Sequence, residues 1–293
     1  MSRLVVVSIL LIGFLACGPD NASEEIVYEA EDFSYDPSIE KLGYPKLSQY
    51  GFFTGDLVNL NPSANVVPYD LNTPLFTDYA KKLRFIYVPD SARIGYNDSE
   101  VLDFPVGAVL IKNFFYSEDQ LQNNSSQIIE TRLLINKPEG WVALPYVWNA
   151  EQTEAFLEIT GYENQIVLAN NNSLNYAVPT IGQCKSCHER NGKIKPIGPN
   201  ARQLNKVYSY KNEPTNQLKK LQELGFLDLP DENLIPKLAQ WDNPESGSLD
   251  QRARAYLEIN CAHCHRREGP AKNSGLYLLA SNRVKRLRWL GIP

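Results

Sequence analysis

The sequence contains one five-residue pattern twice, and this pattern holds most of the residues that could bind a metal or cofactor. The copies are Cys184–His188 and Cys261–His265, each reading Cys-x-x-Cys-His. This is the attachment signature of a c-type haem. Two thiols one helical turn apart each add to a vinyl group of one porphyrin, and the following histidine supplies the proximal nitrogen to iron. The motifs therefore predict two covalently bound haem c groups, with thioether bonds at Cys184, Cys187, Cys261 and Cys264 and proximal ligands at His188 and His265.

Three other roles of paired cysteines compete with haem attachment. A four-cysteine zinc site leaves the histidine after each pair unexplained, and it places thiolates in the oxidising compartment to which the amino terminus points. A thioredoxin-like dithiol belongs in a βαβ unit, which the sequence does not indicate. A disulfide across two intervening residues closes a short loop and stabilises a fold little.

The sequence offers few ligands for the distal side of either iron. Methionine or histidine there favours electron transfer, whereas an open position permits catalysis. The single methionine is Met1. His263 lies between the cysteines of its own motif, so we expect it at the surface or beside a propionate, with ligation of the neighbouring haem as the alternative. An amine or phenolate could instead serve the first haem, and the candidates near its motif are Lys193, Lys195, Tyr208 and Tyr210.

The amino terminus has the pattern of a secretory signal. Arg3 precedes a predominantly apolar run, Leu4–Leu15, which is too short to cross a bilayer as a helix. The Ala-Cys pair that follows resembles a bacterial lipobox, although Phe14 stands where leucine is more usual. We therefore expect a signal peptide over residues 1–16 and a lipid on Cys17; an uncleaved anchor or a plain signal is the alternative. Gly18 after the cysteine favours delivery of the lipoprotein to the outer membrane, where it would face the periplasm.

Charge and composition narrow the classes of partner. The chain has 29 Lys and Arg against 34 Asp and Glu, a net charge of −5, which disfavours a nucleic-acid partner. Residues 17–46 are rich in acidic residues and predict a solvated tether between the lipid and the folded part.

Strand patterns dominate from residue 47 to 180, and helix patterns follow. Short β-branched and aromatic runs separated by turn residues predict strands at Arg84–Val88, Ala108–Tyr116, Ile128–Asn136, Trp141–Trp148, Phe156–Thr160, Ile166–Ala169 and Leu174–Val178. Hairpin loops are expected at Lys137–Gly140 and Gly161–Asn164. Apolar spacing predicts helices at Asn216–Leu224 and after Ser248.

These patterns predict an α+β fold. We expect a β-rich domain over residues 47–180, built as an antiparallel sandwich or bent sheet. Two small α-helical cytochrome c-like haem modules should follow, the first over residues 181–243 and the second over 244–293.

The residues around the motifs resemble a family of bacterial dihaem c-type cytochromes over roughly residues 45–280. The likeness is carried by Val67–Tyr79, Phe104–Gly107, Glu130–Leu134, Pro145–Thr153, Gln183–His188, Pro196–Pro199, Asn260–Ala271 and Ser274–Leu276. It implies haem attachment at both motifs, with His188 and His265 as proximal ligands. Members also share a carboxy-terminal segment with a Met-Pro stretch that this chain does not contain, so we expect the chain to be truncated and the second haem module to be incomplete.

The sequence thus favours an electron carrier over a stand-alone enzyme. The expected protein is an envelope-anchored dihaem cytochrome that exchanges single electrons with a periplasmic redox protein. A haem enzyme of the dihaem peroxidase kind, or the electron-accepting subunit of a dehydrogenase, is the alternative that the missing distal ligands motivate. Against it, no acid–base group can be assigned to either haem from the sequence.

Overall fold

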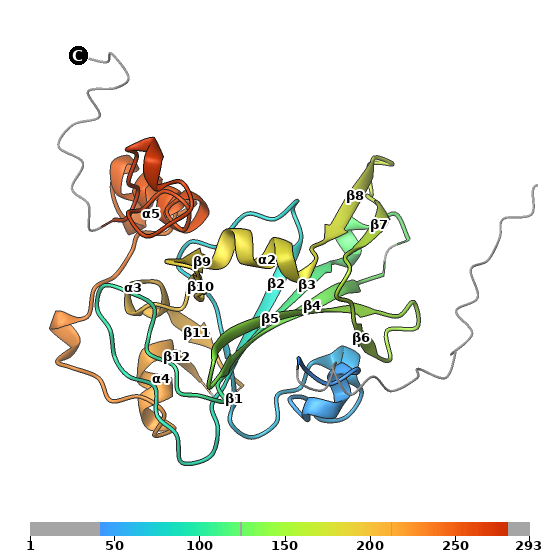
Figure 1. Ribbon diagram of the computed structural model, residues 1–293, viewed down its shortest axis with the longest axis horizontal. Coiled ribbons are helices and arrows are strands. Elements are labelled where there is room, and N and C mark those ends of the chain that lie inside the picture. Colours follow the sequence, from blue (N-terminus) through green and yellow to red (C-terminus); the bar gives the residue numbers. More distant parts are fainter. Residues whose placement is uncertain (1–41, 124, 212, 281–293) are drawn as a thin grey trace, which may run out of the picture. The chain divides into compact units, whose positions relative to one another are not determined.

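A six-stranded antiparallel sheet is the centre of the fold (Figure 1). The computed structural model describes residues 42–123, 125–211 and 213–280. The strands follow one another in space as they do in sequence, and their bounds are β1 Val66–Tyr69, β2 Lys81–Tyr87, β3 Val109–Tyr116, β4 Gln127–Lys137, β5 Gly140–Trp148 and β6 Ala155–Leu157. The predicted hairpin at Lys137–Gly140 is confirmed, because these two residues pair at the turn between β4 and β5.

Both faces of this sheet are covered. Because successive side chains of a strand point to opposite faces, each strand contributes to two layers. Ile111 and Leu133 pack on one face against the segment that holds two 3-10 helices, η1 Leu47–Tyr50 and η2 Leu57–Asn59. Leu110 and Leu134 pack on the other face with apolar residues of the carboxy-terminal part of the chain. The first Cys-x-x-Cys-His motif and the helix that leads into the second lie on that second face.

A separate ribbon packs against one end of the sheet. It consists of β7 Tyr162–Val167 and β8 Ser173–Val178, and it shares a core with Phe114 and Tyr116 of β3. The hairpin loop predicted at Gly161–Asn164 is wrong, because its last three residues belong to β7. The chain turns instead at Leu168, whose amide donates to the carbonyl of Asn172. Pairing with β8 outweighs the turn-forming composition of residues 161–164.

The rest of the described chain combines short helices with two-stranded ribbons. The α-helices are α2 Ile181–His188, α3 Ala201–Leu204, α4 Gln217–Glu223 and α5 Leu249–Cys261. The ribbons pair β9 Glu189–Arg190 with β10 Lys193–Ile194, and β11 Val207–Ser209 with β12 Pro214–Asn216. Further 3-10 turns are η3 Glu118–Gln120, η4 Glu232–Leu234, η5 Pro244–Ser246 and η6 Lys272–Ser274. The helices predicted near residues 216–224 and after Ser248 are confirmed as α4 and α5.

The predicted fold class is wrong in its small α-helical cytochrome c-like modules. Within the described residues the longest α-helix, α5, has 13 residues, and the others have eight or fewer. These helices do not form a bundle of their own. Leu218 of α4 and Ile259 of α5 share one hydrophobic core with Leu110 of the sheet. In α4 the apolar spacing correctly predicts that Leu218 and Leu221 are buried, whereas the buried residues of α5 are Ala255, Glu258 and Ile259. The sheet rather than another helix covers Leu218 and Ile259.

Several expectations lie outside the described residues. These are the signal peptide over residues 1–16, the lipidation of Cys17, most of the acidic tether over residues 17–46, and the last residues of the chain, 281–293. Among the helices that the structure describes, none has both the length and the apolar character needed to cross a membrane.

Candidate cofactor site

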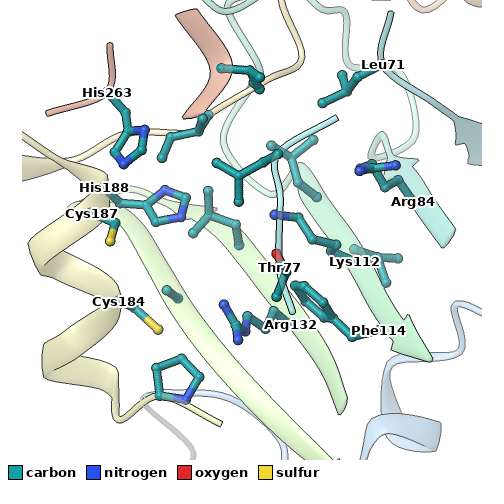
Figure 2. Close-up of a pocket in the computed structure, with 18 of the residues that line it drawn as sticks. Leu71, Thr77, Arg84, Lys112, Phe114, Arg132, Cys184, Cys187, His188 and His263 are labelled. Carbon is teal, nitrogen blue, oxygen red and sulfur yellow. The ribbon is translucent and has the colours of Figure 1, made fainter. Parts of the chain in front are cut away.

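The first motif lies on a well-formed helix next to a cavity. The Thr180 hydroxyl caps α2 by accepting a hydrogen bond from the amide of Gln183 at 3.1 Å. The helix then places the thiols of Cys184 and Cys187 one turn apart and ends at His188. Neither cysteine is in a disulfide. All three motif side chains line a cavity of about 510 Å³ between α2 and the sheet (Figure 2).

This cavity has mainly apolar walls and is large enough for a cofactor. Its volume falls in the range of about 300–1,000 Å³ that is usual for sites of small molecules and cofactors. Leu110 and Phe114 of β3 and Leu134 of β4 form part of its floor, while Ile259 of α5 and Leu71 contribute from other segments. The cavity therefore collects residues from the sheet, α2 and α5 into one site.

His188 is held with one ring nitrogen engaged and the other available. Its Nδ1–H donates to the backbone carbonyl of Lys195 at 2.8 Å. A hydrogen bond of this kind fixes the tautomer and ring orientation of a metal-binding histidine and leaves the Nε2 lone pair for the metal. Burial lowers the pKa of His188 to about 4, so the imidazole is neutral. Lys195 thus contributes its carbonyl to this site, through the backbone.

Three cations stand side by side on the sheet face that forms the floor. Arg84 of β2 is directly opposite Lys112 of β3, and Lys112 is directly opposite Arg132 of β4. All three line the cavity. Like charges in directly opposed positions destabilise a sheet unless something compensates for them. The structure provides that compensation for the two arginines: Arg84 binds Asp70 at 2.8 Å, and Arg132 binds Glu130 at 2.5 Å.

Lys112 differs from the arginines on either side. Within the described residues, its amine forms no hydrogen bond or ion pair. It lies over the Phe114 ring, 5.5 Å from the ring centroid. Burial, together with the charges of Arg84 and Arg132, lowers the pKa of Lys112 to about 7. The centre of the row therefore holds an amine with no anionic partner.

Arg132 is fixed from several sides. Its Nε and one terminal nitrogen donate to the two oxygens of Glu130, which is fully buried. Tyr176 of β8 donates to the same carboxylate at 2.5 Å. The guanidinium also lies over the Phe114 ring, 4.5 Å from its centroid. In Figure 2 the Arg132 guanidinium points towards the helical wall and Cys184.

The second motif begins at the end of α5 and continues into a turn. Ser248 caps this helix, whose last residue is Cys261. His265 Nδ1 is 3.2 Å from the Ser274 hydroxyl. Because that hydroxyl donates its proton to the carbonyl of Ala271, its oxygen accepts from His265, and Nε2 is again the nitrogen left for a metal. Both motif histidines are thus held in the same way.

One residue of the second motif reaches the first motif's cavity. His263 lines it, and its Nδ1 is buried without a hydrogen-bond partner in the described structure. His263 is half-buried with its ring at the cavity, so a fully exposed position is excluded, while a position beside a propionate stays a prediction. The side chains proposed as amine or phenolate ligands do not line this cavity: Lys193, Lys195, Tyr208 and Tyr210.

An ionic network joins the segments that follow the two motifs. Glu100 binds Arg190 at 2.7 Å and Arg266 at 2.5 Å. The amide of Asn191 also donates to the carbonyl of Glu268 at 3.1 Å. The two motifs are therefore held close together, although they lie far apart in the sequence.

The residues of the candidate site fit a covalently attached haem. The cavity presents two free thiols one turn apart and an imidazole with an available Nε2, which are the groups that attachment requires. Its apolar walls suit a porphyrin, and its cations suit carboxylates. In the described ranges no three His, Cys, Asp or Glu side chains gather closely enough to hold a metal ion.

Sequence reasoning missed the three cations, although the strand pattern contained a signal for them. Lys112 is in phase with Leu110, and Arg132 is in phase with Leu134, so each shares a face with a core residue. A charged residue on the buried face of a strand is the unusual feature. The contacts of Glu100 with Arg190 and Arg266 have no comparable signal in the sequence, because the tertiary fold brings these residues together.

Comparisons with known proteins give no further guide. No protein-family model matches this chain, and neither a curated protein nor a solved structure does.

Proposed function

We propose that this protein is a dihaem c-type cytochrome that exchanges single electrons with a periplasmic redox protein. The observation that carries the proposal is the arrangement at the first motif. Cys184, Cys187 and His188 face one cofactor-sized cavity, and the Nδ1–H of His188 is engaged by a backbone carbonyl. A zinc site built from the four cysteines, or a dithiol, would make no use of this oriented histidine.

In this proposal the chain's own residues hold and tune the cofactors. Cys184 and Cys187 attach the first haem and Cys261 and Cys264 the second, while His188 and His265 bind iron through Nε2. When bound, haem supplies a one-electron iron couple, whose potential depends on axial ligands, burial and neighbouring charges. The apolar walls of the cavity exclude water from the first haem, and cations such as Arg132 favour its propionates.

The closeness of the two motifs supports electron passage between them. His263 belongs to the second motif and lines the cavity of the first. The Glu100 network holds the two segments together from outside this cavity. An electron that enters at one haem would therefore have a short route to the other.

A haem enzyme of the peroxidase kind is the second candidate. The position of His263 at the cavity favours it, because peroxide chemistry requires an acid–base group beside the haem. Electron transfer remains the first proposal, since a second haem next to the first serves one-electron exchange directly. The two candidates differ in a simple measurement: turnover of hydrogen peroxide with an electron donor supports the enzyme, and its absence supports the carrier.

The proposed location is the cell envelope. Lipid on Cys17 would hold the protein at a membrane, in our proposal the outer membrane facing the periplasm, through the tether over residues 17–46. Haem attachment to such proteins takes place outside the cytoplasm, which agrees with an exported chain.

A redox titration followed by haem absorption tests the function. Full-length protein made with haem-maturation machinery should take up two electrons in two one-electron steps. The double variant Cys184→Ala/Cys187→Ala and its counterpart Cys261→Ala/Cys264→Ala should each keep one step, and each acts as the control for the other. Unaltered titrations in both double variants would contradict the assignment of the sites.

A further inference from the structure

The sheet side of the cavity supplies a ligand for the iron that the sequence does not reveal. We propose that the amine of Lys112 is the distal axial ligand of the haem attached to Cys184 and Cys187. This inference rests on the proposed function, because it requires a haem in the cavity. In coordination, the amine nitrogen gives its lone pair to iron, and the proton of the former ammonium passes to solvent.

Lys112 and His188 approach the cavity from opposite walls. Lys112 lies near the middle of β3, which has β2 on one side and β4 on the other. Figure 2 shows its amine reaching from the strand side towards His188, which extends from the end of α2. Both side chains line the same cavity. Two nitrogen donors that face one another across a site are what a six-coordinate haem requires.

The second argument is that Lys112 forms no ion pair in the part of the chain that the structure describes. Asp70 pairs with Arg84, and Glu130 pairs with Arg132, while the lysine between these arginines has no ion pair in the described residues. A charged amine held among other cations without a partner is costly. A bond to iron removes this cost, because the amine binds in its neutral form.

A role as the partner of a propionate is the main alternative for Lys112. The arginines are better suited to that role, because a planar guanidinium binds a carboxylate through two parallel hydrogen bonds. The Arg84 Nε is buried without a partner and remains free for such a contact. Arginine has no accessible lone pair at any ordinary pH, whereas lysine does. Ligation is therefore the role that only the lysine in the row can perform.

His263 is the other nitrogen donor at the cavity. It lies on the helical side, in the turn after α5 (Figure 2). Its place between Cys261 and Cys264 ties its position to the attachment of the second haem. The position of Lys112 does not depend on the second haem, because β3 is held by its pairing with β2 and β4.

Nitrogen labelling tests the proposal on the unmodified chain. Full-length protein is made with haem-maturation machinery in the presence of lysine carrying ¹⁵N at the side-chain amine, and the ferric form is examined by pulsed electron paramagnetic resonance. We expect a ¹⁵N coupling of the size typical of a nitrogen bonded to iron. This readout depends on ligation itself and does not require any variant to fold.

Substitution then identifies the lysine. Lys112→Arg keeps the positive charge but cannot ligate, so it should abolish the ¹⁵N coupling and convert one haem per chain from low spin to high spin. Lys82→Arg is the matched control, because Lys82 lies on the neighbouring strand and its amine donates to the carbonyl of Ala80 at 3.1 Å. The control should keep both the coupling and the spin state.

Distinct outcomes separate the ligand proposal from the proposed function. Two haems per chain with no ¹⁵N coupling would overturn the role of Lys112 and leave the cytochrome proposal standing. A coupling that survives in Lys112→Arg would assign another lysine. A high-spin haem in His263→Ala, with Lys112→Arg unchanged, would assign His263 instead. Protein that carries no haem at all would overturn both proposals.

Discussion

Arg266 donates two hydrogen bonds to the carboxylate of Glu100, at 2.5 and 3.2 Å, across 166 positions of the sequence. Glu100 also accepts a hydrogen bond from Arg190. Arg190 follows the first cysteine motif and Arg266 follows the second, so one carboxylate holds both segments. The Arg266 side chain is only 6% exposed, and the loss of Glu100 would leave it with Glu268 as its one carboxylate partner in the described structure.

We predict that Glu100→Gln weakens the contacts that hold the segments after the two motifs together. A lost charge-assisted hydrogen bond at a half-buried site should lower the free energy of unfolding by about 1–3 kcal/mol. Denaturant unfolding of the haem-loaded protein measures this change. Glu151→Gln is the control, because this exposed glutamate should alter stability by less than about 0.5 kcal/mol. Equal stability of the two variants would contradict a structural role for Glu100.

The contribution of Glu100 should also depend on pH. Burial alone would raise the pKa of Glu100, but hydrogen bonds from Arg266 and Arg190 outweigh it and hold the pKa below its usual value. A group with a lowered pKa in the folded state stabilises the fold above its unfolded pKa of about 4.3, and this stabilisation disappears as the pH falls through the folded pKa. The stability difference between wild type and Glu100→Gln should therefore shrink on acidification below about pH 4. A constant difference down to about pH 2 would refute the assignment.

The buried carboxylate of Glu130 should contribute more to the stability of the fold than an exposed charge does. Glu130→Gln removes the negative partner of Arg132 and should lower the free energy of unfolding by about 3 kcal/mol, the lower end for a buried pair, because Glu130 is fully buried while the Arg132 side chain is 30% exposed. Tyr176→Phe removes one hydrogen bond to the same carboxylate and should cost about 1–3 kcal/mol. Thermal unfolding of both variants checks this order.

The matched control for these variants is an exposed ion pair. Arg93 and Asp228 are 60% and 83% exposed, so Arg93→Ala should change stability by less than about 1 kcal/mol. Equal destabilisation by Arg93→Ala and Glu130→Gln would contradict a stabilising role of the Glu130 network.

Lipid anchoring makes a prediction about location. Cys17→Ser should release the protein from the membrane fraction, since a serine cannot carry the thioether-linked lipid. Fractionation of cells, followed by detection of the protein, provides the measurement. Because Cys17→Ser leaves Ala16 and Gly18 unchanged, it tests this cysteine alone. Full retention of the variant in membranes would exclude lipid on Cys17 as the anchor.

Strand positions could be predicted from the sequence because they depend on local patterns. The β-branched and aromatic run that predicts a strand at Ala108–Tyr116 forms β3, and the turn residues at 137–140 join β4 to β5. Helix signals are equally local: the Ser248 capping box begins α5. The cysteine motifs also carry their chemistry in a fixed spacing, and α2 places the first of them beside a cavity.

The parts that failed depend on contacts between distant segments. The apolar spacing of α4 indicates that Leu218 is buried, but it does not show that the sheet covers this residue. In α5 the buried face includes the charged Glu258 beside Ile259, so apolar spacing does not reveal that face. The same holds for Lys112, because its environment is formed by Arg84 from β2 and Arg132 from β4. A sequence pattern reveals that such a residue points inward, while the identity of its neighbours follows from the tertiary fold.

The central claim is that two haems are bonded to this chain, and the intact mass of denatured protein tests it most directly. Denaturation releases any cofactor held only by contacts, whereas thioether bonds at Cys184, Cys187, Cys261 and Cys264 survive. For protein made with haem-maturation machinery, we predict the mass of the processed chain plus two haems. The mass of the chain with no haem would contradict the account.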